Sequence, residues 1–257
     1  MTLIDPGLSV RVYSGRAELG QAAGQDIAVA LRQRLAAQAE VRVVFASAPS
    51  QDSMLESLAR QPGIDWSRIT AFHMDEYLGL PTTAPQRFGA YLQRWLFDHV
   101  RPGRVELIGE LADAAAEAGR YGRLVTAAPV DLVCLGIGEN GHIAFNDPPL
   151  ASFADPEPAR VVRLDERSRQ QQVNDGCFPV LARVPTHAIT LTIPTLMSAR
   201  QLFCVVPGAT KAAAVRAALH GPVDARCPAS VLRRHRSCNL YLDTESAREL
   251  ADQEPWS

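Results

Sequence analysis

The sequence lacks the features that mark membrane-spanning and exported proteins. Its 257 residues contain no apolar run of about 18 or more, the length that a helix needs to cross a bilayer. The first residues, Met1 to Pro6, carry no basic segment followed by an apolar one, so no signal peptide is indicated. We therefore expect a cytoplasmic protein without a membrane partner.

An excess of positive charge is also absent. The 26 Lys and Arg residues are balanced by 28 Asp and Glu residues, which gives a formal net charge of -2. A domain that binds nucleic acid normally shows a basic patch or stripe. The composition therefore argues against a nucleic-acid partner.

The spacings typical of metal-binding cysteines and histidines are missing. The sequence has no Cys-x-x-Cys or His-x-x-x-His pair, and its five cysteines are odd in number and widely spaced: Cys134, Cys177, Cys204, Cys227 and Cys238. Zinc sites use close pairs of ligands, and disulfide frameworks use even numbers of cysteines. We expect free thiols and no metal site.

What the sequence contains is ordinary for a globular protein. Hydrophobic residues make up 47% of the chain and charged residues 21%, close to the average for soluble domains. The length is sufficient for one large domain with its own core, and no internal repeat or low-complexity linker divides it. We expect a single domain over residues 1–257.

Expected strands and helices alternate along the chain. Strands are expected over 41–46, 68–74, 104–108, 130–135, 159–164, 188–193, 202–206 and 239–242, and helices over 15–40, 86–99, 111–125, 210–220 and 227–234, with another through Met54, Leu55 and Leu58. Such alternation predicts an α/β fold of three layers, α/β/α, around a mostly parallel, doubly wound sheet of modified Rossmann-like type.

The strand expected at 130–135 leads into a glycine-rich turn. Gly136, Gly138 and Gly141 have the Gly-x-Gly-x-x-Gly spacing of dinucleotide-binding sites. Such sites need a helix that opens at the third glycine and holds the pyrophosphate. Prolines at positions 148, 149, 156 and 158 leave no room for that helix. The turn is therefore expected to carry titratable groups at a sheet edge and not to bind a nucleotide.

Two long motifs resemble the signatures of the glucosamine-6-phosphate deaminase (isomerase) family, which is related to the 6-phosphogluconolactonases. One is Gly-Ile-Gly-Glu-Asn-Gly-His-Ile-Ala-Phe-Asn-Asp-Pro at 136–148, and the other is Phe-His-Met-Asp-Glu-Tyr-Leu-Gly-Leu-Pro at 72–81. The resemblance extends from about residue 40 to residue 243. It implies conversion of glucosamine 6-phosphate and water to fructose 6-phosphate and ammonia, with no metal or organic cofactor.

The resemblance implies catalytic roles for four residues. Asp75 would move a proton from C2 to C1 of the sugar, and His142, oriented by Asp147 and Asn140, would assist ring opening. Histidine suits that step because its unperturbed pKa lies nearest neutrality. A helix N-cap is the structural alternative for Asp75, and Glu76 beside it is expected to face solvent.

A second group of residues is expected to bind the substrate and its phosphate. These residues are Ser47, Ser50, Gly136, Gly138, Lys211 and Arg169. The sequence departs from the family here, because Ser-Ala-Pro-Ser-Gln at 47–51 replaces a Thr-Gly-Ser/Gly-Thr-Pro turn and lacks its glycines. Arg169 is the nearest counterpart of a phosphate-binding arginine, and Asp147 stands where the family usually has glutamate.

Three alternatives remain open at this level. They are a 6-phosphogluconolactonase-type hydrolase, a deaminase of another amino-sugar phosphate, and a sugar-phosphate-binding module without catalysis. The residues Ile-Ala-Phe-Asn after His142 favour the deaminase over the lactonase, as does the motif around Asp75. The altered turn at 47–51 leaves the identity of the amino-sugar phosphate open, and the oligomeric state, including a homo-oligomer, is also open.

Overall fold

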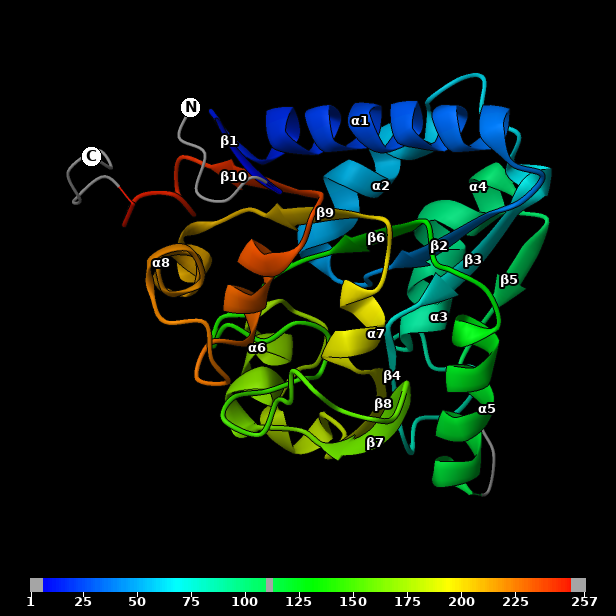
Figure 1. The fold of residues 1–257 in the computed structure, drawn as a ribbon. Helices are drawn as coiled ribbons and strands as arrows, with labels where there is room; N and C mark the ends of the chain where they lie inside the picture. The colour runs from blue at the N-terminus through cyan, green and yellow to red at the C-terminus, as the bar shows by residue number, and fades with distance from the viewer. Residues whose placement is uncertain (1–6, 110–112, 251–257) are drawn as a thin grey trace.

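A computed structural model describes residues 7–109 and 113–250, and its centre is a seven-stranded sheet (Figure 1). The strands are β1 (Leu8–Tyr13), β2 (Val41–Phe45), β3 (Ile69–His73), β5 (Arg104–Glu106), β6 (Leu132–Leu135), β9 (Gln201–Val206) and β10 (Cys238–Asp243). They run in the order β1-β10-β9-β6-β2-β3-β5, and every pairing is parallel. The predicted parallel sheet is confirmed.

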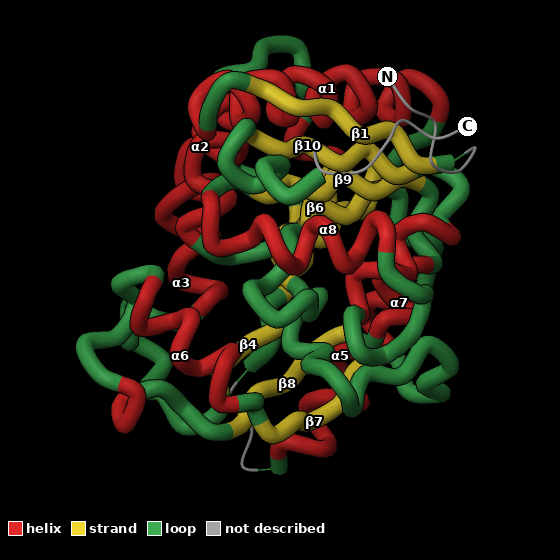
Figure 2. The backbone as a smooth tube through the Cα atoms, turned by 90° about the vertical axis from the view of Figure 1, so that its left-hand side faces the viewer, coloured by secondary structure: helices red, strands yellow, loops and turns green. Residues whose placement is uncertain are grey.

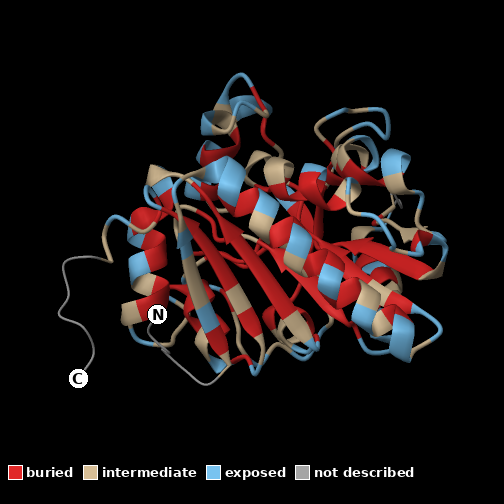
Figure 3. Ribbon diagram, turned by 90° about the horizontal axis from the view of Figure 1, so that it is seen from above, coloured by how far each residue is buried: buried red, intermediate tan, exposed pale blue. Residues whose placement is uncertain are grey.

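Helices cover both faces of this sheet. The longer ones are α1 (Arg16–Ala37), α2 (Asp52–Ala59), α5 (Ala114–Thr126) and α8 (Ala212–His220). Because successive residues of a strand point to opposite faces, Val43 and Phe45 pack with α1 and α2, whereas Val44 packs with α5 and α8. Figure 3 shows the buried strands beneath α1, whose outer side is exposed. The three-layer architecture is therefore confirmed.

A second, antiparallel sheet lies below the first in Figure 1 and Figure 2. It has the order β4-β8-β7, with β4 at Asp75–Tyr77, β7 at Ala159–Arg163 and β8 at His187–Leu191. The strands expected at 159–164 and 188–193 thus belong to this small sheet and not to the parallel one. Helix α5 packs against both β7 and β8.

Several elements differ from the sequence-based expectation. The chain also contains β1, β4, α6 (Glu166–Asn174) and α7 (Ile193–Met197), none of which was predicted. The helix expected at 86–99 is α3 (Phe88–Leu92), a π-helical turn at Gln93–Phe97 and α4 (Asp98–Val100), and the one expected at 227–234 is a 3-10 helix. The expected start of α5, Leu111, lies outside the described residues. No helix in the described ranges is both long and apolar enough for a membrane crossing.

The strand order reverses between β2 and β6. From β2 the chain adds β3 and β5 on one side, and it then returns to add β6, β9 and β10 on the other. Open α/β sheets bind ligands at such a reversal, outside the carboxyl ends of the strands. The predicted site segments follow β2, β3, β6 and β9, so they meet at this edge of the sheet.

His73 ends β3 and is fully buried. Its Nε2 atom accepts a hydrogen bond of 2.8 Å from the backbone N–H of Ile108, which requires an unprotonated Nε2. Burial, with a smaller contribution from the charge of Arg87, lowers the pKa of His73 to about 3. The folded protein therefore holds this imidazole neutral well below the pH at which an exposed histidine takes up a proton.

We expect the free energy of unfolding to fall as the pH drops from about 6.5 towards 3. In that window the unfolded chain binds a proton at His73 and the folded chain does not, so each pH unit costs roughly 1.4 kcal/mol. Urea denaturation at several pH values measures the slope. In His73→Gln, whose side-chain oxygen can accept the same hydrogen bond, the slope should be smaller; equal slopes in the two proteins would contradict the assignment.

Candidate active site

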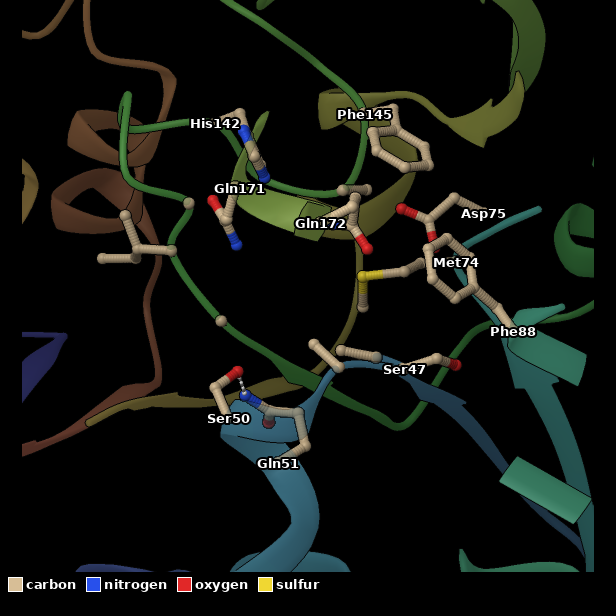
Figure 4. A pocket seen from close by; sticks show the side chains of 16 residues that line it. Ser47, Ser50, Gln51, Met74, Asp75, Phe88, His142, Phe145, Gln171 and Gln172 are labelled. Carbon is tan, nitrogen blue, oxygen red and sulfur yellow. Dashed lines mark hydrogen bonds between the residues drawn. The ribbon is translucent and has the colours of Figure 1, made fainter. Parts of the chain in front are cut away.

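A cavity opens at the carboxyl ends of β2, β3 and β6 (Figure 4). Five segments line it: the turn after β2, residues 74–75 after β3, Phe88 at the start of α3, residues 136–145 after β6, and α6. Of the predicted site residues, six line this cavity: Ser47, Ser50, Asp75, Gly136, Gly138 and His142. The two sequence motifs, which are far apart in the chain, thus meet in one place.

Asp75 lies at the seam between the two sheets, where β3 of the parallel sheet ends and β4 of the antiparallel sheet begins. It begins β4 and pairs with Thr190 of β8, so it begins a strand and is not a helix N-cap. Its side chain is buried, at 7% exposure, and forms no hydrogen bond with any described residue. Burial, together with the negative charges of Glu76 and Asp147, raises the pKa of Asp75 well above its usual range. Such a carboxylate is a strong base aimed at the cavity.

Glu76 is buried, contrary to the expectation that it faces solvent. It is 1% exposed, and its carboxylate accepts the backbone N–H groups of Tyr77, Phe88 and Gly89 at 2.9 to 3.1 Å. The guanidinium of Arg87 lies 3.5 Å away. Glu76 therefore ties the start of α3 to β4 and fixes Phe88, which lines the cavity.

The hydrogen bonds of His142 define its tautomer. Nδ1 lies 2.7 Å from Asn140 Oδ1, 2.8 Å from Ser168 Oγ and 3.1 Å from Asp147 Oδ1. A carboxylate and an amide oxygen only accept hydrogen bonds, so Nδ1 carries the proton. Nε2 has no partner among the described residues and is left as the reactive nitrogen of a ring that lines the cavity (Figure 4).

Asp147 is the anion behind His142. Burial acts to raise its pKa, but hydrogen bonds from His142, Ser168 and Asn140 outweigh burial and lower the pKa to about 2. Its second oxygen accepts the backbone N–H of Asp165 at 3.2 Å. Although it is one methylene shorter than the family's usual glutamate, Asp147 still reaches the imidazole. An ionised partner of this kind stabilises the imidazolium that forms during proton transfer.

Ser168 belongs to this relay and was missed from the sequence. It lies on α6, is 1% exposed, and donates a short hydrogen bond to Asp147 while its oxygen faces His142 Nδ1. Three residues further along the same helix, Gln171 Oε1 accepts the backbone N–H of Glu139 at 2.9 Å. No sequence signal marks Ser168, because α6 reaches the turn only through tertiary packing.

The glycine-rich turn is shaped around His142. A Cβ atom on Gly138 would lie 2.2 Å from the imidazole, and Gly141 has a φ of +85°, which glycine adopts without strain. The N–H groups of Gly138, Gly141 and His142 all bond within the turn, so they are not available to a pyrophosphate. No helix begins between Gly141 and Glu166, in agreement with the rejection of a nucleotide site.

The chain is similar to known proteins over most of its length. The sequence model of a family described as "Glucosamine-6-phosphate isomerases/6-phosphogluconolactonase" matches residues 14–241. The chain belongs to this family. The resemblance that its two motifs suggested is thereby confirmed.

Two curated members of the glucosamine-6-phosphate isomerase/6-phosphogluconolactonase family are similar over most of the chain. The glucosamine-6-phosphate deaminase of Bacillus cereus (strain G9842) is 40% identical over 191 residues, which is 73% of this chain and 70% of the relative. That of Exiguobacterium sibiricum is 38% identical over 196 residues, or 76% and 75% of the two chains.

Solved structures of the family share the fold. A monomeric glucosamine-6-phosphate deaminase superposes with a TM-score of 0.86 at 30% identity, over 94% of this chain and 99% of the other. The 6-phosphogluconolactonase of Leishmania guyanensis has a TM-score of 0.76 at 20% identity, over 93% and 97%. The structural similarity is therefore greater to the deaminase than to this lactonase.

Two of the residues expected at the phosphate do not line the cavity. Lys211 follows β9 and is buried, and its Nζ atom has no hydrogen bond partner in the described chain; burial lowers its pKa. The guanidinium of Arg169 instead donates to the backbone carbonyls of Leu181, Val184 and Pro185 at 2.8 to 3.2 Å. In this arrangement Arg169 is engaged with backbone carbonyls away from the cavity, and no arginine or lysine among the described residues lines it.

Within residues 7–109 and 113–250, no three His, Cys, Asp or Glu side chains come together as ligands of a metal ion would.

Proposed function

We propose that the protein is a glucosamine-6-phosphate deaminase, which converts glucosamine 6-phosphate and water into fructose 6-phosphate and ammonia. One observation carries the proposal: within the part of the chain that the structure describes, the carboxylate of Asp75 accepts no hydrogen bond, and it shares a cavity with His142, whose Nε2 atom has no partner there. The names of relatives that are 40% and 38% identical support it.

His142 opens the sugar ring in this scheme. Its Nε2 atom takes the proton of the C1 hydroxyl and delivers a proton to the ring oxygen, while the bond between C1 and the ring oxygen breaks and C1 becomes an aldehyde. Asp147 and Asn140 hold Nδ1 and stabilise the transient imidazolium. General acid–base transfer by one histidine suits this step, because the same ring nitrogen can take a proton from one oxygen and give a proton to the other.

Asp75 then carries out the isomerisation by moving a proton from C2 to C1. It takes the proton from C2, which leaves an enolamine, and returns it to C1, while His142 protonates the C1 oxygen. C2 is now an iminium carbon, so water adds there and ammonia leaves, which gives the ketone. The C1 aldehyde accepts the electron pair when C2 loses its proton, and the nitrogen lone pair of the enolamine then forms the iminium as C1 takes up a proton, so the scheme needs no metal or organic cofactor.

The phosphate is proposed to bind Ser47, Ser50 and Lys211. Ser47 Oγ and Lys211 Nζ are buried polar atoms without partners among the described residues, and such groups are costly unless a ligand or water satisfies them. Ser50 Oγ accepts a hydrogen bond of 3.0 Å from Gln51 Nε2, which leaves its own hydrogen for an anion. Gly136 and Gly138 would line the path between this group and His142.

The family match over 14–241 supports a single deaminase domain over residues 1–257. We place its activity in amino-sugar catabolism, including that of N-acetylglucosamine, in the cytoplasm.

The assay measures ammonia and fructose 6-phosphate released from glucosamine 6-phosphate by the purified protein. We expect the two products in equal amounts. If the protein hydrolyses 6-phosphogluconolactone and releases no ammonia from glucosamine 6-phosphate, it is a lactonase. If it binds glucosamine 6-phosphate without turning it over, it is a non-catalytic module. If ammonia is released faster from galactosamine 6-phosphate, that sugar is the substrate and the proposed mechanism still applies to it.

A further inference from the structure

Gln172 is a buried amide that the scheme above does not use. It lies on α6 at 7% exposure and lines the cavity. Its side-chain amide forms no hydrogen bond with any part of the chain that the structure describes. Figure 4 shows this side chain reaching into the middle of the cavity, on the side of Asp75 and Met74.

The neighbouring Gln171 has a different role. Its oxygen accepts the N–H of Glu139 at 2.9 Å, and its nitrogen donates to Asp175 at 3.3 Å. Both polar ends of Gln171 are thus occupied within the protein, whereas both polar ends of Gln172 are available to a ligand. The two glutamines share a cavity wall, but only Gln172 can hydrogen-bond a substrate without breaking a protein contact.

The position of Gln172 indicates which part of the substrate it meets. Asp75 and His142 must lie at C1 and C2, where the protons move, and Ser47 and Ser50, the proposed phosphate ligands, line the same cavity. The middle of the cavity therefore faces the carbons between the reacting carbons and the phosphate. An amide both donates and accepts hydrogen bonds, as a hydroxyl group does, and it carries no charge that would disturb the nearby Asp75.

We propose that Gln172 hydrogen-bonds the C3 or C4 hydroxyl of the sugar and thereby determines specificity among amino-sugar phosphates. This inference rests on the proposed function, since it takes the reacting carbons to lie between Asp75 and His142. A site built to hydrogen-bond a hydroxyl rejects analogues that lack it, because its own buried polar group is then left unpaired.

The test is a thermodynamic cycle that combines one change in the enzyme with one change in the substrate. Wild-type protein and Gln172→Met, which is close in size but has no amide, are assayed with glucosamine 6-phosphate and with its 3-deoxy and 4-deoxy analogues. We expect the wild type to lose about 10- to 100-fold in kcat/KM on one analogue, and Gln172→Met to lose a similar factor on the parent substrate. On that analogue the variant should show no further loss, because both changes remove the same hydrogen bond.

Gln170→Met is the matched control, because Gln170 lies on the exposed side of the same helix and bonds only to Asn174 in the described chain. It should retain wild-type kcat/KM on all three sugars. If Gln172→Met fails to fold, Gln172→Asn keeps the amide but shortens its reach, and it should show the same pattern.

The role of Gln172 would be overturned if wild type and variant lost kcat/KM by the same factor on each analogue relative to glucosamine 6-phosphate. It would also be overturned if a folded Gln172 variant kept the wild-type kcat/KM on glucosamine 6-phosphate. Failure of the wild-type protein to release ammonia from glucosamine 6-phosphate would instead overturn the proposed function, so the two failures are distinguishable.

Discussion

Replacing Asp75 by Asn is expected to lower kcat for ammonia release by about 1,000-fold, within the range that a positioned general base contributes. The amide has the same shape as the carboxylate but cannot take the proton from C2. Glu76 and Asp147, whose negative charges raise the pKa of Asp75, remain in the variant. Steady-state kinetics with glucosamine 6-phosphate measure the effect, and thermal unfolding checks that the variant is folded.

Asp98→Asn, at an exposed position on α4, is the control and should keep full activity. A folded Asp75→Asn protein that retained more than a tenth of the wild-type kcat would refute the role of Asp75. In the wild type, the loss of kcat/KM towards acid should occur above about pH 4, the pKa of an ordinary aspartate. The reason is the raised pKa of Asp75, since the base is active only when it is ionised.

The second large effect is expected from His142→Gln. Glutamine can still hydrogen-bond Asp147 through its amide, but it cannot carry a proton between the C1 hydroxyl and the ring oxygen. We expect kcat to fall about 100-fold or more, again measured by ammonia release. His187→Gln, at an exposed histidine of β8, should be unaffected.

The smaller variant His142→Ala gives an independent measurement. It leaves space beside Asn140, Ser168 and Asp147 that added imidazole can occupy, so imidazole should restore part of the activity in a concentration-dependent way. Unchanged kcat in folded His142→Gln would show that ring opening needs no protein group at this position.

Most of the central sheet could be predicted from sequence because its inner strands β2, β3, β6 and β9 are largely apolar on both faces, whereas the edge strand β1 alternates apolar and polar residues and was missed. Strand β4 could not be predicted either, since its three residues begin with Asp75 and Glu76, which look like part of a polar loop. Helix α6 has the sequence Glu-Arg-Ser-Arg-Gln-Gln-Gln-Val-Asn and therefore lacks an apolar stripe. Its stability depends on contacts that only the folded chain provides.

The same helix explains which site residues were predicted and which were not. Positions 168, 171 and 172 are spaced by three and four residues, so they lie on one face of α6, and that face meets the cavity and the glycine-rich turn. Arg169 is rotated about 100° from Ser168 around the helix and binds carbonyl groups elsewhere. Asp75 and His142 stood in recognisable motifs, whereas Ser168 and Gln172 reach the site only through the packing of α6.

The seam at Asp75 also has a consequence for biosynthesis. The base is fixed in place by the pairing of β4 with Thr190 and its neighbours in β8, a segment that the ribosome makes long after Asp75 itself. Contacts between such distant segments form slowly, because a long loop must close first. A nascent chain that ends before β8 can build β2 and β3 but not a positioned base, so the growing polypeptide should be catalytically silent until β8 has emerged.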